Sequence, residues 1–277
     1  MRRVALCCIV NSEALGEFMI LKQSIESFYD CQWYISCNRK TSDILKNEKN
    51  INCFNLLNEN KVNHGVDRPE KNESFYTLLK TKFTILKIAL KEESYAIFLD
   101  TDMIFVHKMD DNILNLVENK IVNVCVTPHF SHDRLNEARV GFYNAGMILV
   151  NKIGFIEKWE EICNSEKSMY YEQPPLEKAL ETETALTLPI TYNMGWWRFK
   201  KGFGEDKLNN LYIDEEGDIS FANMKVINFH LHLEKKLSYP NFGEPLKNKL
   251  LELSNSNIIN NKVKEIILLI GGKKDEY

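Results

Sequence analysis

The feature that most constrains the fold is a short apolar run that ends in two acidic residues. Ala96–Leu99 holds four apolar residues without glycine or proline, and Asp100-Thr101-Asp102 follows directly. Such a run is typical of a strand that is covered on both faces of a sheet. Two carboxylates at the end of a buried strand repel each other unless a cation lies between them. We therefore expect Asp100 and Asp102 to face a crevice and share Mn²⁺ or Mg²⁺, with a solvated turn as the alternative.

The composition fits a folded domain and argues against several other classes of protein. The chain has 277 residues, 44% hydrophobic and 27% charged, which is ample for a buried core. The net charge of −4 argues against nucleic acid as the main partner. The seven cysteines show no CxxC pair and no zinc spacing, as in proteins with reduced thiols. The first residues, MRRVALCCIV, are too short an apolar run for a signal peptide, and no stretch approaches a membrane span, so we expect a cytoplasmic protein.

The apolar pattern predicts strands that alternate with helices. Strands are expected over residues 4–10, 32–36, 51–57, 96–99, 103–106, 121–126, 142–152 and 226–229. Helices are expected from Ser12 (as N-cap) through Phe28, over 75–91, over 110–117, through Cys163, after Glu172 and from Glu244 onward. This alternation is typical of an α/β fold with a mixed, mainly parallel sheet flanked by helices.

Two polar residues of the first half are candidates for ligand contact. Asn11 follows the first expected strand, where the crevice of a nucleotide-binding sheet lies, although a role at the entrance of the next helix is the interpretation we favour. Lys82 lies on the helix expected immediately before the Asp100 strand. It is a solvated charge by default, but this position would let it reach a diphosphate.

In the second half, candidate residues stand beside glycine and proline. Asn144 precedes Gly146 in a strand-like run, where the missing side chain lets a ligand or another backbone approach closely. Glu172 and Gln173 come directly before two prolines, which are tolerated in the first turn of a helix and hold both residues at its entrance. For Glu172, the competing interpretation is that it complements the helix dipole.

Histidines offer further metal ligands. His230 and His232 are two positions apart and so lie on one face of an extended strand. Imidazole suits Mn²⁺ better than Mg²⁺. His129 and His132 lie in a polar loop, for which we favour surface histidines over a metal role.

Five short motifs together resemble the GT-A glycosyltransferases, most nearly the glycogenin-like family eight. In order, they read FLDTDMIF, FYNAG, YEQPPL, LPITYN and FHLHLEKK, within a resemblance that spans roughly Val4 to Lys236. The resemblance implies a GT-A catalytic domain over residues 1–240 and a C-terminal helical extension over 241–277. The donor-binding part would be about 1–126, and the acceptor and sugar part about 127–240.

The resemblance also implies roles at the metal–diphosphate end of the site. Asp100 and Asp102, with Thr101 between them, would hold the metal and the nucleotide-sugar. His230 would be the third protein ligand and Lys236 the phosphate partner. The H-x-H pair departs from the family pattern and leaves His232 open as the ligand. Leu233 stands where the family has glycine.

At the sugar end, the resemblance implies that Asn144 and Gln173 bind the donor sugar and that Lys82 touches the sugar or the diphosphate. Glu172 stands where the family usually has aspartate, one methylene shorter. In a retaining enzyme Glu172 would orient or stabilise the oxocarbenium-like centre, and in an inverting one it would accept the acceptor's proton. The sequence leaves this outcome and the oligomeric state open.

The implied function is metal-dependent transfer of a sugar, expected from a UDP-hexose or a related UDP-sugar, to a glycan or another hydroxyl acceptor. The main alternative is a degenerate GT-A domain that binds a sugar nucleotide or glycan without catalysis. A haloacid-dehalogenase-like phosphatase fits less well, because its D-x-D opens the chain and Thr or Val stands where Ile104 does here. A sugar-nucleotide pyrophosphorylase needs a Gly-rich basic loop after the first strand, and CCIVNSEALG is not one.

Overall fold

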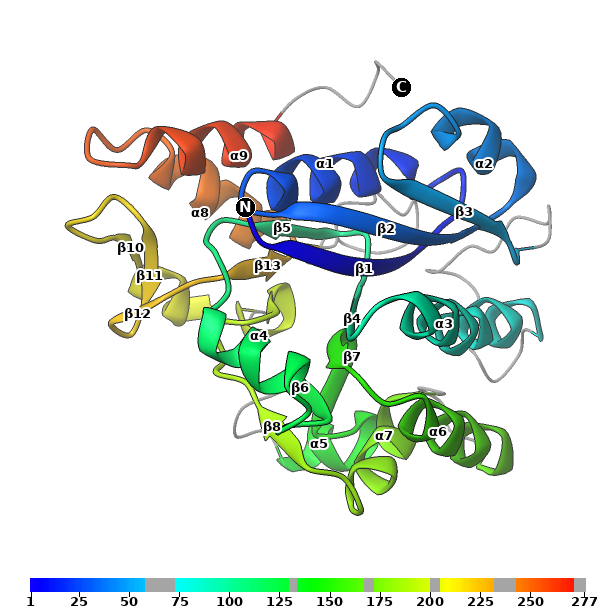
Figure 1. Ribbon diagram of the computed structural model, residues 1–277. Helices are drawn as coiled ribbons and strands as arrows, with labels where there is room; N and C mark the ends of the chain where they lie inside the picture. The colour runs from blue at the N-terminus through cyan, green and yellow to red at the C-terminus, as the bar shows by residue number, and fades with distance from the viewer. Residues whose placement is uncertain (58–72, 130–133, 167–171, 200–204, 232–242, 272–277) are drawn as a thin grey trace.

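The computed structural model describes residues 1–57, 73–129, 134–166, 172–199, 205–231 and 243–271 (Figure 1). Within these ranges the largest element is a seven-stranded sheet in the order β3-β2-β1-β4-β7-β6-β8. Its strands are β1 (Arg3–Val10), β2 (Asp30–Cys37), β3 (Ile51–Asn55), β4 (Ala96–Leu99), β6 (Val124–Pro128), β7 (Tyr143–Val150) and β8 (Ala185–Thr187). Only β7 runs against both of its neighbours, β4 and β6, and the other pairings are parallel. The predicted mixed, mainly parallel sheet is confirmed.

Helices cover both faces of this sheet, because its central strands are apolar on both sides. The helices are α1 (Leu15–Glu26), α2 (Arg39–Leu45), α3 (Glu73–Glu92), α4 (Asp111–Glu118), α5 (Arg134–Val140), α6 (Ile153–Ser165) and α7 (Gln173–Leu180). Leu6 of β1 packs in a core with Phe18 of α1, whereas its neighbour Cys7 packs in a second core with Phe83 of α3 and Trp159 of α6. Figure 1 shows α1 on one side of the sheet and α3 and α6 on the other.

A second, small sheet brings the end of the chain to the Asp100 strand. It has the order β5-β13-β9, from β5 (Met103–Phe105), β13 (Asn228–His230) and β9 (Met194–Gly195). In this register His230 lies opposite Met103 on one side and Gly195 on the other. The histidine therefore reaches the turn that carries the two aspartates.

The remaining elements complete the part that follows α7. They are the 3-10 helices η2 (Trp196–Phe199) and η3 (Glu205–Asn210), the strands β10 (Leu211–Ile213), β11 (Ile219–Phe221) and β12 (Met224–Lys225), and the helices α8 (Glu244–Leu253) and α9 (Asn261–Gly271). Leu250 of α8 and Ile267 of α9 share a third core with Phe229. Lys262 donates to the Ser27 carbonyl at 3.0 Å, so α9 docks beside α1. No helix in the described ranges is long and apolar enough to cross a membrane.

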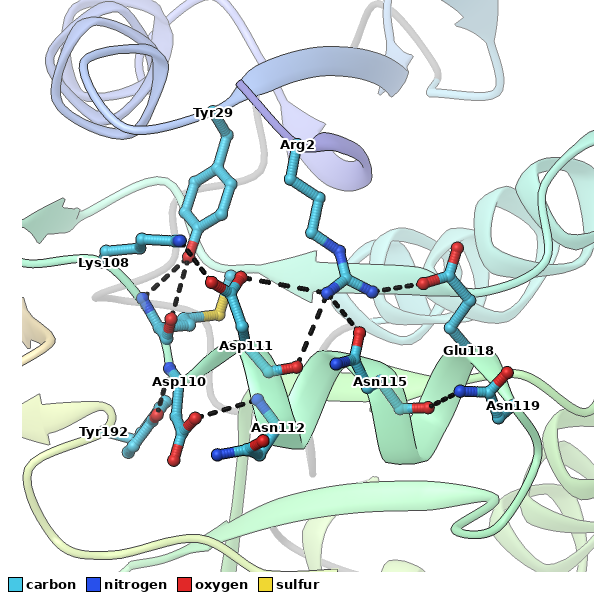
Figure 2. A network of polar contacts seen from close by, with 11 residues as sticks. Arg2, Tyr29, Lys108, Asp110, Asp111, Asn112, Asn115, Glu118, Asn119 and Tyr192 are labelled. Carbon is cyan, nitrogen blue, oxygen red and sulfur yellow. Dashed lines mark hydrogen bonds and ion pairs between the residues drawn. The ribbon is translucent and has the colours of Figure 1, made fainter.

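A polar network fixes the connection between β5 and α4 (Figure 2). The Tyr29 hydroxyl accepts from the Met109 N–H at 2.7 Å, and the Tyr192 hydroxyl accepts from the Asp110 N–H at 3.0 Å. Arg2 donates to Asn115 Oδ1 at 2.7 Å on α4. Tyr192 belongs to the LPITYN motif, which therefore has a structural role at this point.

The entrance to α1 differs from the prediction. The helix begins at Leu15, after Ala14 as N-cap without a side-chain hydrogen bond, and ends at Glu26. Ser12 is therefore not the cap. Asn11 Oδ1 accepts from the Ala14 N–H at 2.8 Å and closes a tight turn before the helix. Because this turn takes up the residues after Asn11, the helix starts later than predicted.

Candidate active site

Two carboxylates and one imidazole converge where β4 ends. The Asp100 N–H donates to the Gly146 carbonyl at 2.8 Å, which ties the turn to β7. His230 Nε2 lies 2.8 Å from Asp102 Oδ1 and 3.9 Å from Asp100 Oδ2. One ligand atom from each of the three lies within 4.8 Å of the others. Two carboxylate oxygens and an imidazole nitrogen form a donor set that suits Mn²⁺.

Gly146 is part of this site because a side chain there would occupy the space of the site residues. A Cβ at this position would lie 2.5 Å from Asp100 Oδ2, 2.8 Å from Asn144 Oδ1 and 3.0 Å from His230 Cε1. The two closest contacts are shorter than real Cβ contacts, so any other residue would displace an acidic or amide oxygen. The glycine within the strand lets the carboxylate, the amide and the imidazole meet over the backbone.

The electrostatics of the site favour positive charge. Burial lowers the pKa of His230, but the carboxylates of Asp102, with which the ring pairs, and of Asp100 outweigh burial and hold this pKa above its ordinary value. Asp102 is the more buried of the two carboxylates, with 16% of its side chain exposed against 38% for Asp100. A divalent cation between the two carboxylates would supply such positive charge.

Lys82 and Glu172, both predicted site residues, form a buried ion pair. Lys82 Nζ lies 3.0 Å from Glu172 Oε1, donates to the Ala145 carbonyl at 3.0 Å and lies 4.3 Å from the centre of the Phe98 ring. The Lys82 side chain is 2% exposed and that of Glu172 11%. Trp159 Nε1 donates to the Glu172 carbonyl at 2.8 Å and fixes the backbone there. Lys82 is therefore not the solvated charge that its position on α3 suggested.

Glu172 does not act as a cap for its helix. It is the N-cap residue of α7 by position, yet its side chain makes no capping hydrogen bond and points to Lys82 instead. The competing helix-dipole interpretation therefore does not account for this contact.

The amides of Asn144, Gln173 and Asn193 connect the sugar end of the site to the metal end. Asn144 Nδ2 donates to Gln173 Oε1 at 3.4 Å, and Asn144 Oδ1 accepts from Asn193 Nδ2 at 2.7 Å. Asn193 Oδ1 lies 3.0 Å from His230 Nδ1. Asn193 was not among the site residues predicted from the sequence. The signal that points to it is the LPITYN motif, of which it is the last residue.

His129 is buried, which corrects the expected surface position. Its ring lies 5.0 Å from that of Trp197, which in turn lies edge-on 4.9 Å from the His230 ring. Trp197 Nε1 donates to the His129 carbonyl at 2.6 Å. Burial, with smaller effects of Arg198 and His230, lowers the pKa of His129 to about 3, so its ring is neutral. His129 thus packs beneath Trp197 of η2 instead of lying at the surface.

Of the other predicted site residues, Thr101 and Asn11 lie within the described ranges. Thr101 lies half-buried in the turn between the two aspartates. The Asn11 side chain closes the turn before α1, as the favoured interpretation expects, and its contact with a nucleotide stays a prediction. Lys236, His232 and His132 lie outside the described residues.

No protein-family model and no curated protein matches the chain. Among solved structures, it is similar to the galactosyltransferase LgtC in complex with donor and acceptor sugar analogs, with 10% identity and a TM-score of 0.54 over 97% of this chain and 95% of that one. The chain has the GT-A glycosyltransferase fold.

Two further glycosyltransferases share this fold. The bifunctional glycosyltransferase WbbM is 13% identical with a TM-score of 0.54, over 97% of this chain and 52% of WbbM. GlyE of Streptococcus pneumoniae TIGR4 is 13% identical with a TM-score of 0.53, over 96% of this chain and 63% of GlyE. The chain thus spans about half the length of WbbM and under two thirds of GlyE. At these identities the likeness establishes the fold, and the predicted membership of the glycogenin-like family stays a prediction.

Proposed function

We propose that this chain is a metal-dependent glycosyltransferase that moves a sugar from a nucleotide donor to a hydroxyl acceptor. The observation that carries the proposal is the convergence of Asp100, Asp102 and His230 at the carboxyl end of β4 in a GT-A fold. In open α/β sheets, ligands bind in the crevice outside the carboxyl ends of the strands. The similar LgtC structure contains donor and acceptor sugar analogs, which supports a sugar donor and a sugar acceptor.

At the metal end, Asp100, Asp102 and His230 would hold Mn²⁺ or Mg²⁺. The ion would act as a Lewis acid that stabilises the negative charge on the departing nucleoside diphosphate. Lys236 is proposed as the second positive charge at the phosphates, and Thr101 as a contact of the nucleotide-sugar.

At the sugar end, Asn144 and Gln173 would bind the donor sugar through their amides. The Lys82–Glu172 pair would lie beneath the sugar. Because Lys82 holds one Glu172 carboxylate oxygen, we assign Glu172 to orienting the sugar and stabilising positive charge at the anomeric carbon, rather than to proton transfer. UDP is the proposed nucleotide, and Asn11 at the end of β1 is the proposed contact for it.

Thermal unfolding with a panel of sugar nucleotides tests the proposal. UDP-, GDP-, CMP- and dTDP-sugars would be added with and without Mn²⁺ to the wild type, to Asp102→Ala and to Asp43→Ala, an exposed aspartate on α2. A ligand present at 100 times its Kd stabilises the folded state by about 2.7 kcal/mol, a readily measured shift. We expect a shift with one UDP-sugar that requires Mn²⁺, disappears in Asp102→Ala and persists in Asp43→Ala.

Turnover separates the enzyme from a binding domain. Slow release of UDP from the identified donor without acceptor is expected of the enzyme. A shift without any release of UDP would favour the degenerate domain instead, and no shift with any donor would contradict the proposal.

A further inference from the structure

Asn193 is a buried residue whose side-chain amide and backbone N–H have hydrogen-bond partners. Its side chain has no exposed surface. Nδ2 donates to Asn144 Oδ1 at 2.7 Å and to Thr127 Oγ1 at 3.0 Å, and Oδ1 lies 3.0 Å from His230 Nδ1. Its backbone N–H donates to Asn228 Oδ1 at 2.8 Å. Groups from β6, β7 and β13 therefore fix one orientation of this side chain.

The direction of these hydrogen bonds is set by a backbone amide. The Gly146 N–H can only donate, and it lies 2.8 Å from Asn144 Oδ1, so this atom is the acceptor oxygen. The Asn193 atom that faces the same oxygen at 2.7 Å must then be a donor, Nδ2. Asn193 Oδ1 consequently faces His230, and an oxygen acceptor there requires the proton on Nδ1.

We propose that Asn193 is a positioning residue that fixes the metal-ligating tautomer of His230. With one proton held on Nδ1, Nε2 is the nitrogen that gives up its proton to an ion, and it faces Asp100 and Asp102, where the ion would be held. The inference rests on the proposed function, because it assigns His230 to the metal. Such partners of a ligating histidine orient the ring and raise its basicity.

The same contacts join the metal to the sugar end. Asn144, the proposed sugar-binding residue, is hydrogen-bonded to Gln173 on one side and to Asn193 on the other. If the bound sugar shifts the Asn144 side chain, the Asn193 amide would pass this shift on to His230. Asn193 thus gives this site a direct physical connection between donor sugar and metal.

The backbone of Asn193 determines which variants are informative. Its φ is 52°, in the left-handed region that asparagine and glycine tolerate and most residues do not. Asn193→Gly removes the side chain and keeps this backbone conformation accessible. Asn193→Asp keeps size, shape and an oxygen acceptor toward His230 Nδ1, but places a second acceptor against Asn144 Oδ1.

The neighbouring residue supplies a matched control. Tyr192 lies in the same segment, and its hydroxyl accepts from the Asp110 N–H, away from the metal residues. Tyr192→Phe therefore removes one hydrogen bond of the same segment without touching the chain of amides. This variant tests whether the loss of any hydrogen bond in this segment weakens metal binding.

The first measurement is the affinity of the full chain for Mn²⁺ alone, by titration calorimetry or by the electron paramagnetic resonance signal of free Mn²⁺. We expect Asn193→Gly to bind Mn²⁺ about 10–100-fold more weakly than the wild type, and Tyr192→Phe to bind as the wild type does. Asn193→Asp keeps an acceptor for the Nδ1 proton and should therefore bind Mn²⁺ more tightly than Asn193→Gly does. Near-UV circular dichroism confirms that each variant is folded. Wild-type affinity in Asn193→Gly, or an equal loss in Tyr192→Phe or in Asn193→Asp, would overturn the inference and leave the proposed function intact.

A second measurement needs no variant. Two-bond ¹H–¹⁵N spectra of the wild type with diamagnetic Cd²⁺ report which ring nitrogen of His230 carries the proton. We expect the proton on Nδ1 and the metal on Nε2. A proton on Nε2 would overturn the inference even if the Asn193 variants fail to fold, whereas a wild type that binds neither ion would overturn the proposed metal dependence as well.

Discussion

Replacing Lys82 by methionine should destabilise the protein strongly, because it strands a buried carboxylate. Lys82 is 2% exposed, and its Nζ lies 3.0 Å from Glu172 Oε1. Removing one partner of a buried ion pair costs about 3–5 kcal/mol, since the remaining charge stays desolvated. For a chain of this size, we expect Tm to fall by about 10 °C, measured by calorimetry.

The same helix provides the control. Lys87 pairs with Glu160 at 2.7 Å, but 28% of the lysine and 25% of the glutamate side chain are exposed. Lys87→Met should cost only about 0–1 kcal/mol, because solvent screens the pair and hydrates the remaining charge. The two substitutions are chemically identical and differ in burial.

A double-mutant cycle completes the experiment. Glu172→Gln in the Lys82→Met background removes the stranded charge, so we expect it to restore about 1–3 kcal/mol of the lost stability. If Lys82→Met costs no more than Lys87→Met, the buried-pair argument is refuted. Lys82 would then be available to a ligand rather than committed to Glu172.

Three more predictions concern the metal site and its surroundings. Gly146→Ala should abolish Mn²⁺ binding in calorimetry, because the Cβ would lie 2.5 Å from Asp100 Oδ2, whereas Gly154→Ala, with open space around its Cβ, should not. Asp102→Asn should weaken Mn²⁺ binding more than Asp100→Asn in the same titration, because Asp102 is more buried and closer to the histidine. His129 has a folded-state pKa of about 3, below its unfolded value, so it destabilises the fold as pH falls below about 6.5. Denaturant unfolding from pH 6 to 4 should therefore show a steeper loss for the wild type than for His129→Phe, by about 1.4 kcal/mol per pH unit; equal slopes would contradict this.

The sequence predicted the parts of the fold that depend on local pattern. The unbroken apolar run of Ala96–Leu99 became a fully buried central strand, and the helical spacing over 75–91 became α3. The convergence of Asp100, Asp102 and His230 was also predicted, because the motif order implied it.

Contacts that depend on how distant elements pack were not predictable. Lys82 and Glu172 are 90 positions apart, and their pairing depends on how α3 and α7 both pack against α6. The burial of His129 involves Trp197, which is 68 positions later in the chain. The role of Asn193 depends on a left-handed backbone and on partners from three strands, none of which the local sequence specifies.

The dipeptide Tyr192-Asn193 shows how one backbone conformation can serve two parts of the molecule. Because Asn193 is left-handed, the chain turns sharply between the two residues. The Tyr192 hydroxyl reaches the start of α4, in the network of Figure 2, while the Asn193 amide reaches His230. The tyrosine hydroxyl therefore anchors the β5–α4 connection, and the asparagine amide contacts the histidine. The stability of the β5–α4 connection and the geometry of the metal site therefore depend on a common backbone turn.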